Sequence, residues 1–300
     1  MHGWIILDKP LGLGSTQGVS AVKRALRDGG YGKFKVGHGG TLDPLATGVL
    51  PIAIGEATKL AGRMLDSDKI YEFTIDFGTE TDTLDAEGKA IATAALRPRP
   101  SEVRAALPRF TGPIAQIPPA YSALKVNGER AYDLARAGDT VVLNARQVTI
   151  HELALLFADS AAEDEPVESA TLRAHVSKGT YIRSLARDLA RHLGTRGHVT
   201  MLRRIKAGPF TLADAITLDK LRELGHGRAL EDKLLPLRAG LDDIPALSLS
   251  PDQAGLLRQG QVLIGITMDD GPCFAMLGDV PVALAEALGG SIRVVRGFNL

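Results

Sequence analysis

Two short segments with strictly alternating side chains constrain the fold of this chain more than any other feature. In residues 71–78, YEFTIDFG, large apolar residues alternate with polar ones, and residues 171–177, TLRAHVS, repeat that period. A period of two is typical of strands that bury one face, as in antiparallel sheets. Residues 15–27 and 181–194 instead space their apolar residues like one face of a helix. We therefore predict an α+β fold with a mixed, mainly antiparallel sheet and flanking helices.

The remaining segments divide the chain into a large and a small part. We expect a strand in IILDKP, a helix capped by Ser15 or Thr16, and no regular structure in the glycine-rich residues 28–40. Composition changes near residues 240–250. These patterns predict a main domain at residues 1–243 and a small β-rich domain at 244–300. Within the small domain we expect strands around 261–267, 272–277 and 291–298.

Cysteine and histidine usage limits the possible chemistry. The one cysteine, Cys273, excludes disulfides within the chain and cysteine-rich zinc sites, and we expect it to be inert. The seven histidines lack the spacings of metal-binding motifs, so we expect no metal. No segment approaches the roughly 20 apolar residues that cross a bilayer. We therefore expect a cytoplasmic protein without a membrane partner.

Charge is unevenly distributed, although the formal net charge is zero. Residues 171–210 contain nine Lys and Arg residues but a single acidic residue, Asp188. Such a local excess of positive charge favours binding to a polyanion, because each neutralised phosphate releases counterions. A solvated helical face that binds nothing is the alternative explanation.

The segment with the strongest indication of chemistry is residues 36–59, VGHGGTLDPLATGVLPIAIGEATK, whose one aspartate is Asp43. Glycines before Asp43 allow a ligand to approach closely, and Pro44 restricts the aspartate to an extended backbone. An Asp-Pro pair is also typical of turns. A second segment, TDTLDAEG, places Asp82 and Asp85 around a turn, which is typical of a hydrated hairpin. One alternative function is a glycoside hydrolase that uses Asp43 together with Asp82 or Asp85. Such an enzyme would need the two carboxyl groups about 5–10 Å apart across a sugar.

Three further candidates each have a structural explanation beside the functional one. His38 lies between glycines, where an imidazole can be merely exposed or can stack on a nucleobase. Tyr71 belongs to an apolar strand face, which favours core packing. Arg183 lies in the first turn of a helix, where it can hold a carboxylate or form a weak surface ion pair.

Six motifs together resemble the TruB family of RNA pseudouridine synthases, and most closely its bacterial members that act on tRNA. They are DKPLGLGST, GHGGTLDPLATGVLPIAIGEATK, DSDKIYEFTIDFG, TDTLDAEG, IPPAYSALKVNGERAYDLARAG and SKGTYIRSLARDLA. They occur in the family's order between residue 4 and about residue 210. One departure is Gly39, where the family more often has threonine. Residues 244–300 resemble only faintly the family's PUA-like RNA-binding domain.

The resemblance implies that uridine at position 55 in the T-loop of tRNA is converted to pseudouridine by base flipping, without a cofactor. It assigns the nucleophilic carboxylate to Asp43, its ion-pair partner to Arg183, and the residue that stacks on the base to Tyr71. Extruding the base costs a few kcal/mol, and His38 is expected to fill the vacated space. Further substrate contacts are implied for pocket and phosphate-binding residues: Tyr181, Leu202, Asp85, Lys23, Arg24, Lys33, Lys35, Arg203 and Arg204.

The expected partner is tRNA, bound through its T-loop and T-stem by a monomer that needs no other protein and no guide RNA. A guide-RNA-dependent synthase of the archaeal and eukaryotic branch usually has a fuller C-terminal domain than residues 244–300. A non-catalytic RNA-binding or chaperone protein would use the same basic face without needing Asp43. The sequence leaves open whether Asp43 adds to C1′, adds to C6 of the base or assists a glycal route.

Overall fold

The computed structural model describes residues 1–126, 128–139, 141–158 and 162–300. These residues form two compact units. Unit 1 comprises Met1–Asp43, Val49–Leu65 and Gly208–Leu300, and unit 2 comprises Pro44–Gly48 and Asp66–Ala207. No helix in the described ranges is long and apolar enough to span a membrane.

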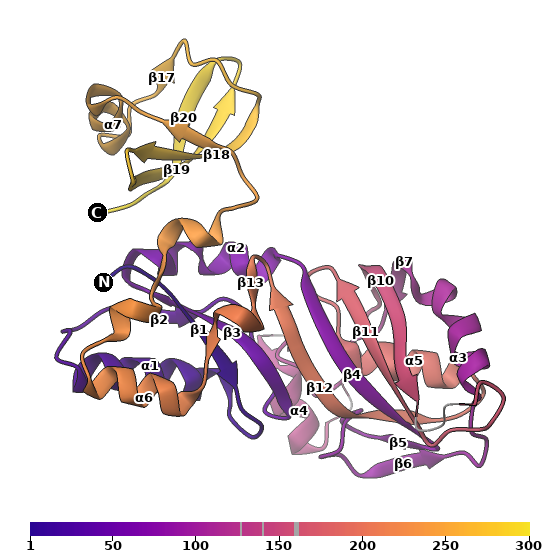
Figure 1. The fold of residues 1–300 in the computed structure, drawn as a ribbon. Helices are drawn as coiled ribbons and strands as arrows, with labels where there is room; N and C mark the ends of the chain where they lie inside the picture. Colours follow the sequence, from indigo (N-terminus) through magenta and orange to yellow (C-terminus); the bar gives the residue numbers. More distant parts are fainter. Residues whose placement is uncertain (127, 140, 159–161) are drawn as a thin grey trace. The chain divides into compact units, whose positions relative to one another are not determined.

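Unit 1 contains a sheet around the N-terminal strand β1, Gly3–Lys9 (Figure 1). β1 is parallel to β14, Ala215–Ile216, and antiparallel to β15, Leu235–Pro236. It lies beside β3, Ala46–Ile54, whose last residues pair with β2, Val36–His38. Strand β2 lies inside the glycine-rich segment, so the expectation of no regular structure there is wrong. The sequence hides this strand because its three residues are too few to show a period of two.

Two helices of unit 1 pack closely on each other. The predicted helix at 15–27 is confirmed as α1, Ser15–Asp28, and its neighbour is α6, Leu218–His226. A Cβ added at Gly225 would lie 3.0 Å from Ala25, so the small residue allows the close approach. The other short elements of unit 1 are η1 Gly55–Leu60, α2 Ala61–Asp66, β13 Phe210–Thr211, η3 Leu212–Asp214, η4 Leu230–Lys233 and η5 Leu237–Gly240.

The C-terminal residues of unit 1 form a second sheet with its own apolar core. Its order is β16-β18-β19-β20-β17, and β16 is parallel to β18 while the other pairs are antiparallel. The three predicted strands are present, and the sequence reading missed the other elements. The boundary at 243/244 stays a prediction. The elements are β16 Ala246–Ser248, α7 Pro251–Arg258, β17 Leu263–Ile264, β18 Gly271–Leu277, β19 Val280–Leu288 and β20 Ser291–Gly297.

Unit 2 is built on a long, mainly antiparallel sheet whose strands lie side by side in Figure 1 in the order β12-β4-β11-β10-β7. The first residues of β3 add a parallel pairing to β12. Both alternating segments are strands, and Phe73 and Leu172 are fully buried as their period predicts. The strands are β4 Lys69–Phe77, β7 Gly112–Gln116, β10 Arg146–Ala158, β11 Ser169–Val176 and β12 Gly197–Ala207.

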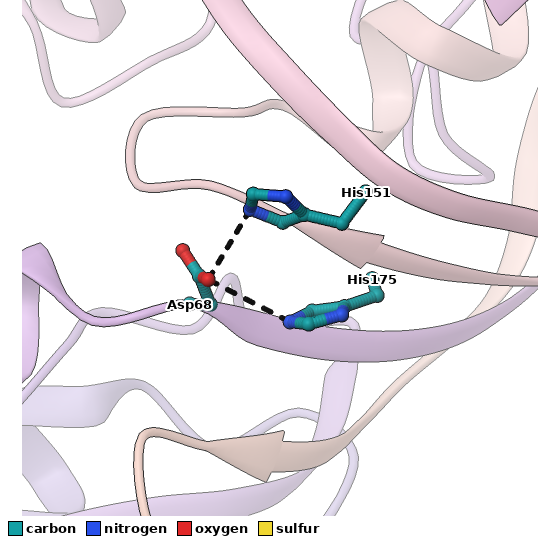
Figure 2. A group of neighbouring side chains, drawn as sticks. All are labelled: Asp68, His151 and His175. Carbon is teal, nitrogen blue, oxygen red and sulfur yellow. Dashed lines mark ion pairs between the residues drawn. The ribbon is translucent and has the colours of Figure 1, made fainter. Parts of the chain in front are cut away.

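One face of this sheet packs on the predicted helix at 181–194, which is confirmed as α5, Ile182–His192. Near the start of β4, Asp68 lies beside His151 of β10 and His175 of β11 (Figure 2). The predicted mixed, mainly antiparallel α+β fold is thus confirmed. The other elements of unit 2 are β5 Thr79–Thr81, β6 Ala90–Thr93, α3 Pro100–Ala106, η2 Leu107–Phe110, β8 Lys125–Val126, β9 Glu129–Arg130 and α4 Ala131–Ala137.

Candidate active site

Asp43 lies in unit 1 on a loop that a distant serine fixes. The Ser15 hydroxyl accepts a hydrogen bond from the Leu42 N–H at 2.8 Å and lies 3.0 Å from the Leu42 carbonyl, to which it donates. Both groups are buried, and the Asp43 side chain that follows is half-buried. Ser15 therefore positions the loop instead of capping the helix. The cap is Gly14, whose N–H donates to the Gln17 side chain at 2.7 Å, so the predicted Ser15 or Thr16 cap is wrong.

The segment that leads to Asp43 is packed tightly in unit 1. His38 is half-buried at the end of β2, where it pairs with Ile52. A Cβ at Gly39 would lie 2.7 Å from the Met64 Cβ, which no real Cβ contact tolerates without a shift. Met64 thus fills the space that the family's more usual threonine would need. This packing explains the one departure from the family motif.

Gly48 explains the small-residue frame after Asp43. Its φ of +99° belongs to the left-handed region, and an added Cβ would lie 2.2 Å from the Arg204 carbonyl oxygen. Only glycine meets both demands at this position. It allows the start of β3 to pair with β12 in unit 2.

Tyr71 and Leu202 lie at the edge of the apolar core of unit 2. Both side chains are half-buried and pack against the core residues of β4 and its neighbours. Tyr181 is half-buried too, and the buried Gln116 fixes its backbone: Gln116 accepts from the Tyr181 N–H at 2.8 Å and donates to its carbonyl at 3.2 Å. The Arg146 guanidinium lies 4.8 Å from the centre of the Tyr181 ring. These aromatic groups therefore offer flat, partly dry surfaces of the kind that stack on a base.

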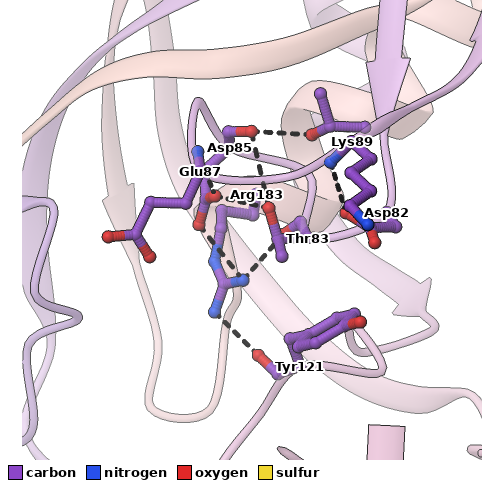
Figure 3. Close-up of polar contacts among 8 residues, drawn as sticks. Asp82, Thr83, Asp85, Glu87, Lys89, Tyr121 and Arg183 are labelled. Atoms are coloured by element: carbon purple, nitrogen blue, oxygen red, sulfur yellow. Dashed lines mark hydrogen bonds and ion pairs between the residues drawn. The ribbon is translucent and has the colours of Figure 1, made fainter. Parts of the chain in front are cut away.

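Arg183 is buried and held by the turn between β5 and β6 (Figure 3). It donates to the Thr83 carbonyl at 2.7 Å and to the Tyr121 carbonyl at 3.0 Å, and it lies 3.5 Å from the Asp85 carboxylate. Because two carbonyl oxygens and a carboxylate surround the planar guanidinium of Arg183, its orientation is fixed. The predicted pair with Asp43 stays a prediction.

The turn that carries Asp85 is strained and closed. Leu84 has a φ of 63°, which is costly for a branched side chain, and its carbonyl accepts from the Val199 N–H at 3.0 Å. The Asp85 carboxylate accepts from the Thr83 hydroxyl at 2.5 Å and from the Glu87 N–H at 3.1 Å. Asp85 lies in the turn of the predicted hairpin, between β5 and β6, but it is only 8% exposed, so it is buried there and not hydrated. Its contacts in Figure 3 are to protein, and its substrate contact stays a prediction.

The expected phosphate-binding residues differ in exposure. Lys23, Arg24, Lys33 and Lys35 are exposed in unit 1. In unit 2, Arg203 is half-buried and donates to the Thr47 hydroxyl at 3.3 Å. Arg204 is only 1% exposed, and its contact with phosphate stays a prediction.

Much of the positive charge in residues 171–210 is compensated inside unit 2. Within the described residues, at least five of the nine basic side chains form ion pairs, so the free positive charge of this segment is smaller than its composition suggests. The pairs are Arg173–Glu72, Lys178–Asp66, Arg183–Asp85, Arg187–Asp188 and Arg191–Glu80.

Lys69 of the same unit is a buried cation. Burial and the nearby charge of Arg204 lower the pKa of Lys69 to about 8.

A family model described as "TruB family pseudouridylate synthase (N terminal domain)" matches residues 27–182, more than half of the chain. The chain belongs to the TruB family. The model of the "tRNA pseudouridylate synthase B C-terminal domain" matches residues 183–242.

Among TruB relatives, the tRNA pseudouridine synthase B of Novosphingobium aromaticivorans is 67% identical over all of this chain and 98% of its own length. That of Zymomonas mobilis is 60% identical over all of this chain and 96% of its own length. A solved H/ACA ribonucleoprotein bound to a substrate RNA containing 2′-deoxyuridine is similar in fold, with a TM-score of 0.74 at 22% identity. The alignment covers 99% of this chain and 85% of that one, so the pseudouridine synthase fold is confirmed.

Sequence reasoning missed Ser15 and Gln116 as residues that position the TruB motifs. Both act on backbone groups far away in the chain, Ser15 on Leu42 and Gln116 on Tyr181. The signal for Ser15 was present, because LGLGST is part of the family resemblance, but a serine before a helix is more often read as a cap. No local pattern marks Gln116.

Proposed function

We propose that this chain isomerises uridine to pseudouridine in the T-loop of tRNA, with Asp43 as the nucleophile. The observation that carries the proposal is the site of Asp43. A half-buried carboxylate follows a residue whose N–H and carbonyl are both hydrogen-bonded to a buried serine. The backbone next to the carboxylate is thereby fixed, while the carboxylate stays partly accessible, as a reacting group must be. Full-length similarity to tRNA pseudouridine synthase B proteins supports the choice of substrate.

The reaction breaks the N1–C1′ bond, rotates the uracil and forms a C5–C1′ bond. The proton lost from C5 is balanced by the proton gained at N1, so atoms and charge balance without a cofactor. Asp43 acts at the junction of sugar and base. Tyr71 stacks on the detached uracil and accepts a proton in the later step, and Arg183 supplies positive charge to the reacting groups. Exclusion of water by half-buried side chains keeps the uracil from being lost.

Binding requires the target nucleotide to leave the T-loop stack. His38 fills the vacated space, and Tyr181 and Leu202 line the base pocket in this proposal. The exposed Lys23, Arg24, Lys33 and Lys35 contact phosphates, where each contributes sequence-independent affinity. Arg203 is a further phosphate contact of this kind.

The proposed enzyme acts in the cytoplasm as a monomer, without a guide RNA or a second protein. Residues 244–300 then serve as a PUA-like RNA-binding domain that adds contacts to the T-stem. Their five-stranded sheet has its own core, which supports a domain of independent packing.

The test is incubation of purified protein with an unmodified tRNA transcript in a chelating buffer, followed by mapping of pseudouridine. We expect product at the T-loop uridine. Asp43→Asn is expected to lower turnover by at least roughly 10⁴-fold, the scale of loss of a nucleophile, while tRNA affinity changes little. Asp219→Asn, at an exposed position of α6, is the matched control and is expected to be fully active.

Each competing function gives a different outcome. A non-catalytic RNA-binding protein would give no product with either chain. A guide-dependent synthase would give product only when a guide RNA is added. Loss of tRNA binding in Asp43→Asn would make Asp43 a structural residue and overturn its assignment.

A further inference from the structure

Three potential metal ligands converge on one face of the unit 2 sheet (Figure 2). Asp68 directly precedes β4, and the two histidines come from β10 and β11. His175 is paired with Ile70, one position away from the pair of Tyr71 and Ala174. Because side chains alternate along a strand, His175 points away from the face that carries Tyr71. The group is therefore separate from the proposed catalytic residues of this sheet.

The strand that carries His151 is irregular at this position. Its pairing with β11 shifts between Ile150 and Glu152, so residue 151 is an extra residue in the ladder. Ile150 is fully buried, whereas His151 and Glu152 are both exposed. Bulges of this kind commonly aim a side chain at a functional position. The bulge is a feature of the backbone, so it indicates a functional position independently of the chemistry of the three side chains.

The geometry of the group is close to that of a metal site. The Nε2 atoms of His151 and His175 lie 3.2 Å and 3.7 Å from the same Asp68 oxygen, Oδ2. The ligand atoms of all three residues lie within 4.8 Å of one another. Tetrahedral bonds of about 2.0–2.1 Å separate ligand atoms by about 3.3 Å. Small rotations of the exposed Asp68 and His151 and the half-buried His175 would close the difference.

We propose that Asp68, His151 and His175 bind a divalent transition-metal ion such as Zn²⁺. Two imidazoles and one carboxylate form a donor set that suits Zn²⁺ and its neighbours, whereas Mg²⁺ prefers oxygen ligands. Three protein ligands leave one tetrahedral position, which water takes. The ion links the start of β4 to β10 and β11, so its effect is on the stability of unit 2.

The test titrates the full-length chain with ZnCl₂ in a calorimeter and compares it with His175→Ala and Asp68→Asn. We expect one Zn²⁺ per chain, no heat with MgCl₂, and affinity at least tenfold lower in each variant. His226→Ala, at an exposed position of α6, is the matched control and is expected to bind like the parent chain. Saturating Zn²⁺ is expected to raise the melting temperature of the parent chain by roughly 5 °C, and that of His175→Ala much less.

Cobalt gives a second readout of the ligand set. Co²⁺ is expected to show the visible absorption of a tetrahedral site in the parent chain and to lose it in both ligand variants. Equal Zn²⁺ affinity in the parent chain and His175→Ala, or no binding at millimolar Zn²⁺, would overturn the proposal. Pseudouridine formation by the variants is expected to stay unchanged, so failure here and failure of the proposed function are distinguishable.

Discussion

At the scale of single residues, packing gives a physical reason for glycine at position 39. Gly39 leaves room for Met64, whose Cβ occupies the space of a side chain at position 39. The two positions are therefore coupled, and a change at one has to be judged together with the other.

Gly39→Thr is expected to lower the free energy of unfolding by about 1–3 kcal/mol, because the added side chain overpacks against Met64. In the double variant with Met64→Ala, the loss is expected to be smaller than the sum of the single losses by at least about 1 kcal/mol. Urea denaturation of the parent chain, the two single variants and the double variant measures the free energy of unfolding of each. Gly37→Thr is the control, since a Cβ at Gly37 meets nothing within 4 Å. Additive losses would contradict the coupling.

Asp85 holds the buried guanidinium of Arg183, so its charge matters more than its shape. Asp85→Asn is expected to reduce the rate of pseudouridine formation at least roughly tenfold, because a buried cation loses its carboxylate. Asp82→Asn is the control, since Asp82 accepts from the Lys89 N–H at 2.8 Å in the same turn. Single-turnover assays with tRNA, beside binding measurements, distinguish a loss of chemistry from a loss of affinity. Equal activity of Asp85→Asn and Asp82→Asn would show that the Asp85 carboxylate does not position Arg183.

Candidate site residues can be proposed from sequence where a family motif is local, whereas contacts that close a long loop cannot be predicted. The motifs around Asp43, Tyr71 and Arg183 single these residues out, and their roles stay predictions. The partnership of Ser15 with Leu42 and the grouping of Asp68 with two histidines depend on tertiary pairing. The local sequence also does not predict that Arg204 is buried, because the adjacent Arg203 is the same residue type and is only half-buried.

At the scale of elements, a salt bridge joins α5 to β5. The Arg191 guanidinium donates to both oxygens of Glu80 at 2.9 Å and 2.5 Å, and the Glu80 side chain is only 3% exposed. These hydrogen bonds raise the pKa of Arg191. Glu80 is therefore a buried charge that depends on one partner.

Arg191→Gln is expected to lower the free energy of unfolding by about 2 kcal/mol. Loss of a partner from a buried pair costs about 3–5 kcal/mol, and the half-exposed arginine places this pair at or below the lower end. Arg104→Gln removes an exposed pair with Glu163 in the same unit and is expected to cost less than about 1 kcal/mol. Urea denaturation compares them, and equal losses would contradict a special role of Glu80.

Elements with a clear period were predictable, and short or ambiguous ones were not. β4, β11 and α5 follow their apolar spacing closely. β2 is too short to show a period, and β19 contains VALAEAL, whose alanine and leucine residues favour a helix by propensity. Pairing on both sides, to β18 and β20, makes β19 a strand.

For the molecule as a whole, the reactivity of Cys273 measures how tightly the C-terminal sheet is packed. Cys273 lies in β18 with no exposed surface, so it belongs to the packed core of this sheet. Burial raises the pKa of the Cys273 thiol. The folded state therefore holds the thiol proton more tightly, and this stabilisation is full below about pH 9 and is lost as pH rises through the folded pKa.

At pH 8 the native chain is expected to react with iodoacetamide at least roughly tenfold more slowly than the chain in urea, because the thiolate is the nucleophile. Ser248→Cys, at an exposed position of the same sheet, provides the control. Mass spectrometry is expected to find no adduct on the native parent chain and one on the variant. Equal rates with and without urea would mean that this sheet opens freely.

Unit 1 is assembled from three separate segments of the chain. Strand β1 is synthesised first and β3, its neighbour on one edge, follows soon after it, but its other partners β14 and β15 follow only after residue 214. At 5–20 residues per second, that interval is on the order of 10–40 s. During translation, unit 2 can fold while the edge of β1 that pairs with β14 and β15 is still open, and this is the period when a chaperone would have most to protect.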